Sequence, residues 1–225
     1  GGTIGSTALT SSGKGIILSG NNTQVWNGNF TFEGEKYLTI GGGNITLGNN
    51  ITVTVNNLSS NLSSGAGGFA VWGNIGGNYG VTKTGNGTLV LKGNNAFSGG
   101  VTLNEGSLNI NEDSGLGTGT LIINSGTIGN SMPANRTIAT NNKQIWNGDF
   151  TFYLNNSTAQ FNLGNGSVSL NRTLTVTTLN GTFTVGGNIS GSAALTKAGD
   201  GSLVLKGANS FNGGVALNAG SLYID

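Results

Sequence analysis

The chain contains two imperfect copies of one long unit, and this repetition constrains the fold more than any other feature of the sequence. The stretch NNTQVWNGNFTF at residues 21–32 returns as NNKQIWNGDFTF at residues 141–152. Residues 85–111 return at residues 199–225 with most positions unchanged in character. Such copies predict a stack of similar elements, each contacting its neighbours, rather than a globular domain with one thick core.

A third match sets the phase of the units, because GTIG at residues 2–5 returns at residues 126–129. We therefore expect one domain over residues 1–225, made of a first unit, 1–125, and a second unit, 126–225, truncated at its C-terminal end. The stretch GLGTGTLIINS has no counterpart in the second unit. The chain thus begins and ends within a unit, which predicts an excerpt of a longer protein or a subunit that stacks end to end.

Apolar residues alternate within each unit over runs of three to six residues, such as residues 88–92 and 101–103, and each run is bounded by Gly or Asn. Period-two alternation predicts strands, and Gly and Asn tolerate the positive φ of sharp corners. Helical spacing is found nowhere over a useful length. The sequence therefore predicts an all-β chain of very short strands.

A parallel β-helix, or β-solenoid, of about ten short-stranded circuits satisfies these constraints together. Only 35% of the residues are hydrophobic, 8% are charged and 43 are Gly. A thin cylindrical core needs few apolar residues, and neutral amides stack at its corners without repulsion. Because side chains alternate between the two faces of a strand, we expect Leu89, Leu91, Leu203 and Leu205 to point inward and Lys92 and Lys206 to point outward.

Several function classes are excluded by composition. The chain has no Cys and no His, which removes the usual zinc and iron–sulfur ligands and Cys–His or Ser–His–Asp catalysis. Its net charge is +1 and its lysines are scattered, so we expect no nucleic-acid partner. No run of eighteen apolar residues exists, so we expect no membrane-spanning helix in this chain.

Residues 85–110 and 199–224 resemble the autotransporter-associated β-strand repeat, also called the passenger-associated transport repeat. The pattern is G-x-G-x-L-x-L, followed by G-G and later by G-x-L. The resemblance implies a right-handed parallel β-helix in an autotransporter passenger or related surface protein, with a role in export and with neither catalytic residues nor a cofactor. The structural repeat positions that it marks are Gly85, Gly87, Leu89, Leu91, Gly99, Gly100, Gly199, Gly201, Leu203, Leu205, Gly213 and Gly214.

The aromatic residues are the first candidates for a binding site. Trp26 and Trp146 recur in matching places, and aromatics in a period-two strand usually pack in the core. Trp72 has no partner, because Gly186 occupies the matching position of the second unit. We therefore single out Trp72, with Phe69 and Tyr79, as a candidate contact for a glycan or another partner.

The acidic residues are interpreted as solvated loop carboxylates, with no metal site. Calcium needs six to eight oxygen ligands, and the glycine-rich calcium repeat is absent. A polysaccharide-cleaving β-helix enzyme is the enzymatic alternative and would require a carboxylate cluster in a groove. The two arginines, Arg136 and Arg172, are expected on different circuits, so we expect no enzyme. The acidic residues considered are Glu33, Glu35, Glu112, Asp113 and Asp200.

Two functional hypotheses remain open. The first is an extracellular stalk or fibre segment of a Gram-negative-type bacterium that aids its own export. Its partner would be itself, by head-to-tail stacking into filaments, or neighbouring repeats of a longer chain. The second is an adhesin module that binds glycans or a host surface at the outer membrane. The sequence does not choose between them.

Overall fold

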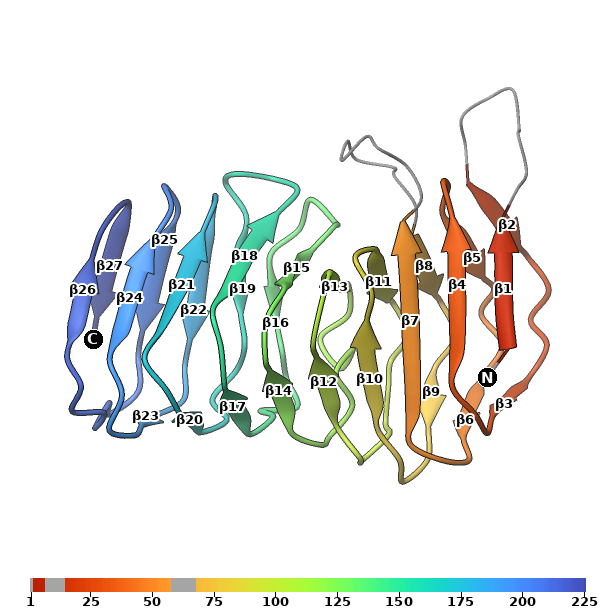
Figure 1. The fold of residues 1–225 in the computed structure, drawn as a ribbon, viewed down its shortest axis with the longest axis horizontal. Coiled ribbons are helices and arrows are strands. Elements are labelled where there is room, and N and C mark those ends of the chain that lie inside the picture. Colours follow the sequence, from red (N-terminus) through yellow and green to blue (C-terminus); the bar gives the residue numbers. More distant parts are fainter. Residues whose placement is uncertain (1, 7–14, 58–67) are drawn as a thin grey trace.

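The computed structural model describes residues 2–6, 15–57 and 68–225, and these residues form strands, turns and irregular segments with no helix. The strands stack into one elongated coil with the two termini at opposite ends (Figure 1). Every strand pair is parallel, and each strand pairs with the strand one turn earlier or later. The predicted all-β solenoid is confirmed, with about nine turns in place of the expected ten.

Turn length explains the difference in the number of turns. Val101 pairs with Leu121, 20 residues later, whereas Val53 pairs with Lys83, 30 residues later. A longer turn uses more residues, so fewer turns fit into the same length of chain.

Each turn crosses three faces, so the coil is three-sided. The first face is β1 (Gly2–Ser6), β4 (Phe30–Gly34), β7 (Ile51–Asn57), β10 (Val81–Thr84), β12 (Val101–Leu103), β14 (Leu121–Ile123), β17 (Gln144–Trp146), β20 (Val168–Leu170) and β23 (Ile189–Ser190). The second is β2 (Ile16–Leu18), β5 (Leu38–Ile40), β8 (Gly68–Val71), β11 (Thr88–Leu91), β13 (Ser107–Ile110), β15 (Thr127–Asn130), β18 (Phe150–Leu154), β21 (Leu174–Thr178), β24 (Leu195–Ala198) and β26 (Val215–Leu217).

The third face consists of two separate sheets. Near the N-terminus it is β3 (Gln24–Trp26), β6 (Ile45–Leu47) and β9 (Ile75–Gly76). Later in the chain it is β16 (Arg136–Thr137), β19 (Gln160–Asn162), β22 (Thr182–Val185), β25 (Ser202–Leu205) and β27 (Ser221–Ile224).

The core is a set of apolar columns that run the length of the coil. Leu89, Leu91, Leu203 and Leu205 are all buried, as parity predicts, while Lys92 and Lys206 lie outside. In-register parallel pairing places equivalent inward residues about 4.8 Å apart, so each turn covers the one before it. Buried aromatics stack in the same way, with the rings of Phe152 and Phe183 4.4 Å apart.

Stacked amides line one corner, as the sequence predicts. The side-chain nitrogen of Asn124 donates to the amide oxygen of Asn104 at 2.7 Å, and Asn147 donates to Asn124 at 2.8 Å. Asn171 continues the ladder by donating to Asn147 at 2.8 Å. Each ladder bond joins two successive turns, which ties the corner together without charge.

The two units do not superpose face on face. β3 lies on the third face, whereas its counterpart β17 lies on the first. Likewise β10 lies on the first face and its counterpart β24 on the second. One unit therefore takes five full turns plus one further face. Equivalent strands of the two units consequently lie on different faces of the coil.

Candidate functional site

The most elaborate polar arrangement is a corner built around the buried side chain of Lys83, on β10. Its ammonium nitrogen Nζ donates to the carbonyl oxygens of Thr84 at 2.7 Å, Gly85 at 2.7 Å and Glu105 at 3.1 Å. Glu105 belongs to the following turn, so the lysine ties two turns together. Three carbonyls match the three donors of an ammonium group, which is how a charge can lie in this core.

Glycine is required around this lysine. Gly85 and Gly106 have φ of 76° and 67°, in the left-handed region. A Cβ atom at Gly106 would overlap the carbonyl oxygens of Gly85 and Gly87 and lie 2.9 Å from the Lys83 Nζ. The close approach of two turns and the lysine cap therefore depend on the same missing side chain.

The corner recurs in the second unit with Lys197. Its Nζ donates to the carbonyl oxygens of Ala198 at 2.8 Å, Gly199 at 2.7 Å and Ala219 at 3.0 Å. Gly199 has φ of 76°, as Gly85 does. This second copy shows that the arrangement is a constant part of the unit.

Burial and a neighbouring carboxylate act in opposite directions on both lysines. Burial lowers the pKa of Lys83 from 10.5 to about 8, and the charge of Glu105 partly opposes the fall. Burial also lowers the pKa of Lys197, with Asp200 opposing it. The carboxylate near the lysine therefore comes from different sequence positions in the two units: Ala219 replaces Glu105, and Asp200 replaces Asn86.

The predicted repeat positions are placed as backbone and core elements. The leucines lie in the inward columns, and four glycines, Gly85, Gly100, Gly199 and Gly214, have positive φ. A Cβ atom at Gly99 or Gly213 would overlap backbone of the preceding turn. Lys83 and Lys197 were not among the predicted positions. The recurrence of TKTGNG at residues 82–87 as TKAGDG at residues 196–201 is the signal that could have found them.

The candidate contact of Trp72, Phe69 and Tyr79 is not one surface. Trp72 and Tyr79 are 42% and 41% exposed, but Phe69 is 1% exposed. Phe69 is buried on β8, where its ring packs 5.9 Å from that of Phe32, so it does not share the exposed surface of Trp72 and Tyr79. The ammonium of Lys92 lies 4.3 Å from the centre of the Trp72 ring, which leaves the exposed aromatic partly covered by a cation.

Two of the acidic residues form ion pairs with an arginine. Arg136 pairs with Asp113 at 3.0 Å and with Glu112 at 3.7 Å across one turn. In the part of the chain that the structure describes, no three acidic side chains gather where a metal ion could be held. The described segments also contain no helix suited to crossing a bilayer.

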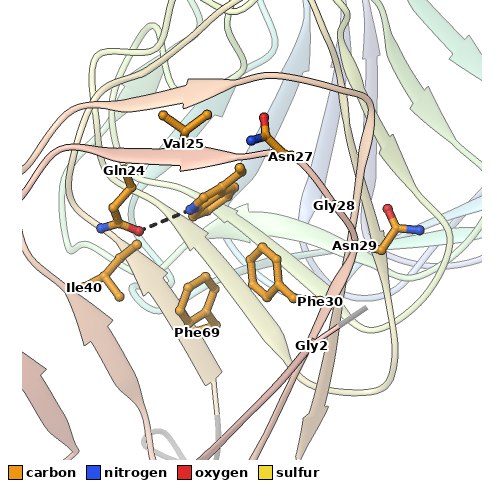
Figure 2. Close-up of a pocket in the computed structure, with 10 residues that line it drawn as sticks. Gly2, Gln24, Val25, Asn27, Gly28, Asn29, Phe30, Ile40 and Phe69 are labelled. Carbon is orange, nitrogen blue, oxygen red and sulfur yellow. Dashed lines mark hydrogen bonds between the residues drawn. The ribbon is translucent and has the colours of Figure 1, made fainter.

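An apolar groove of about 590 Å³ opens beside β3, near the N-terminal end of the coil. Figure 2 shows the rings of Phe30 and Phe69 facing it, with Gln24 and Ile40 at its side. Trp26 also lines the groove, and its indole nitrogen donates to the side-chain oxygen of Gln24 at 3.1 Å.

Comparison with known proteins identifies the repeat. The model of the passenger-associated-transport-repeat matches residues 81–110 and 195–224. Over 53 residues, 24% of this chain, the sequence is 45% identical to the adhesin BmaC autotransporter of Brucella suis biovar 1 (strain 1330). That stretch is 2% of the adhesin, so the chain spans a small fraction of this curated relative. No solved structure matches the chain.

The two matched ranges coincide with structural blocks. They run over β10–β13 and β24–β27 and include both lysine corners. The chain is therefore an autotransporter passenger-like β-helix segment, and this repeat implies a secreted or surface location.

Proposed function

We propose that the chain is a non-catalytic stalk segment of an extracellular protein on a Gram-negative-type bacterium. The observation that carries this proposal is the continuous three-sided stack, in which the recurring polar groups of the repeat bind backbone of the next turn. Lys83 and Lys197 hold carbonyl oxygens inside the coil, where they reach no external ligand. Such a stack extends a surface protein and resists proteases, since its backbone is hydrogen-bonded turn by turn.

The same corners support a role in export. A segment that folds stably outside the membrane opposes backward sliding of the chain, so its stability contributes to secretion. Gly106→Ala strains one corner, whereas Gly76→Ala is a matched control, because a Cβ atom at Gly76 has no atom within 4 Å. With the chain in an autotransporter passenger, we expect Gly106→Ala to lower the amount displayed at the cell surface and Gly76→Ala to leave it unchanged. Equal display of both variants would contradict the export role.

Catalysis has no part in this proposal. Arg136 forms surface ion pairs with Glu112 and Asp113, so these charged side chains bind one another. A polysaccharide lyase or hydrolase would instead need carboxylates free to face a substrate. Incubating the chain with acidic and neutral polysaccharides, with product detected by reducing-end release, tests this directly, and release above a buffer control would contradict it.

Adhesion is the second candidate function. It is favoured by the exposed ring of Trp72 and by the adhesin named among the chain's relatives. An exposed aromatic ring presents a flat apolar face on which a sugar ring can stack. On a glycan array, an adhesin would lose binding with Trp72→Ala and keep it with Tyr153→Ala, whose ring is 44% exposed elsewhere. If the unchanged chain binds no glycan above background, adhesion is refuted and only the stalk function remains.

A further inference from the structure

Trp72 and Lys92 occupy the same corner position on successive turns. Val71 pairs with Leu91 in parallel register, and the Lys92 N–H donates to the Val71 carbonyl oxygen at 2.9 Å, which continues the register by one residue. The two side chains leave the coil side by side, with the ammonium nitrogen of Lys92 4.3 Å from the centre of the Trp72 ring. An aromatic ring and a cation are thus held together at one exposed corner.

The position beside Trp72 on the preceding turn carries no side chain. Ile40 pairs with Val71, so the residue next to Trp72 on that turn is Gly41. This glycine explains why Trp72 is 42% exposed although it lies between two turns. A flat apolar surface beside the cation is therefore accessible to a ligand.

Two amide side chains extend the same corner. Asn74 and Asn94 follow the tryptophan and the lysine by two residues, and both are exposed. The Asn94 backbone N–H donates to the Asn74 side-chain oxygen at 2.8 Å, and the Asn94 side-chain oxygen accepts from the Ser114 hydroxyl at 3.1 Å. Neither side-chain nitrogen has a partner among the residues that the structure describes. These N–H groups can donate to oxygen atoms of a ligand.

The cation at this corner has no acidic partner. Across the described ranges, the ion pairs are those of Arg136 with Glu112 and Asp113, so Lys92 is bound to no carboxylate. An anionic group of a ligand can therefore pair with Lys92 without displacing a carboxylate of the chain.

The second unit keeps the scaffold of this corner but not its aromatic ring. The Ala208 N–H donates to the Asn188 side-chain oxygen at 2.8 Å, which repeats the amide bond of the first unit. Gly186 replaces the tryptophan, and a Cβ atom there would overlap a side chain of the preceding turn. Trp72 also lies outside residues 81–110, which match the repeat model. The ring is therefore a feature of the first unit that the stacking of turns does not require.

We propose that this corner binds an anionic glycan, with a carboxylate-bearing sugar ring stacked on Trp72 and its carboxylate paired with Lys92. The side-chain N–H groups of Asn74 and Asn94 donate to hydroxyl oxygens of the sugar. The proposal rests on adhesion, the second candidate function, and deepens it by naming the class of sugar. A neutral sugar can use the ring and the amides but offers no charge to the ammonium, so the carboxylate provides the discrimination.

A glycan array that presents each carboxylated glycan beside its neutral methyl ester tests the proposal. The panel carries glucuronate, galacturonate and sialic acid termini, so the ring stays constant while the charge changes. We expect the unchanged chain to bind the acids about three- to tenfold more tightly than the esters, between the effect of an exposed ion pair and that of a hydrogen bond to a charged group. Lys92→Gln should remove this preference, and Trp72→Ala should weaken binding of both forms.

Lys206→Gln is the matched control, because Lys206 is exposed at the equivalent corner beside Gly186. It should leave both the binding and the preference unchanged, and circular dichroism checks that every variant is folded. Equal binding of acids and esters, or a preference that survives Lys92→Gln, would overturn the anionic site while leaving adhesion through Trp72 standing. If the unchanged chain binds neither form above background, the site and glycan adhesion are both refuted, and the stalk function is unaffected.

Discussion

Replacing Lys83 with Met removes an ammonium group while keeping most of the buried side-chain volume. Three carbonyl oxygens, of Thr84, Gly85 and Glu105, then lose their shared donor. A buried polar group without its partner costs about 1–3 kcal/mol, so three cost about 6 kcal/mol. Against this, the fall of the Lys83 pKa from 10.5 to about 8 corresponds to about 3 kcal/mol of unfavourable burial of the charge, which Met does not carry.

The difference between the cost of the three unpartnered carbonyls and the cost of burying the charge predicts that Lys83→Met lowers the free energy of unfolding by about 3 kcal/mol. Urea unfolding followed by circular dichroism and by tryptophan fluorescence measures it, since Trp146 is buried in the core. Lys206→Met is the control, because Lys206 is exposed and its replacement is expected to change stability by less than about 0.5 kcal/mol. Lys197→Met repeats the experiment in the second unit.

The result that refutes the reasoning is a Lys83→Met chain as stable as the unchanged chain, or more stable. The burial of the charge would then outweigh its three hydrogen bonds, as happens when apolar residues replace some buried ion pairs. The lysine corner would in that case be a feature of specificity rather than of stability.

Three other predictions follow from the same contacts. Gly106→Ala is expected to destabilise the chain by about 2–4 kcal/mol in urea, through positive φ and overlap with two carbonyls, whereas Gly76→Ala stays within about 1 kcal/mol; equal effects would contradict the corner geometry. Stability should rise from pH about 8 to about 10.5, because the unfolded chain then holds a proton that folded Lys83 has lost, and this rise should shrink in Lys83→Met; an unchanged rise would assign it to other groups. Asn124→Asp places a carboxylate against the amide oxygen of Asn104, so the melting temperature should fall at pH 7 and recover near pH 3 relative to the unchanged chain.

Much of the fold follows from local pattern. Alternation along residues 88–92 determines which side chains face inward, and the inward positions of Leu89 and Leu91 agree with it. Gly85 and Gly100 mark corners, because glycine adopts positive φ at little energetic cost. These properties depend on residues a few positions apart, so the sequence expresses them directly.

Part of the candidate site was open to prediction and part was not. The recurrence of Lys83 as Lys197 is visible in the sequence, but its three carbonyl partners are not, because one of them belongs to the next turn. Phe69 is an aromatic residue of the kind found in binding sites, yet its position on β8 places its ring in the core. The pairing of Arg136 with Asp113 likewise joins residues that are neighbours only through stacking.

By itself the sequence determined a coil of short parallel strands, its inward columns and its glycine corners, because a period of two and a positive φ are properties of the local chain. Only the tertiary structure decided which residues stack. Paired residues on successive turns are 19 to 31 residues apart, so the register between turns depends on loop lengths as well as on strand pairing. As a result, equivalent strands of the two units lie on different faces of the coil, as β3 and β17 do.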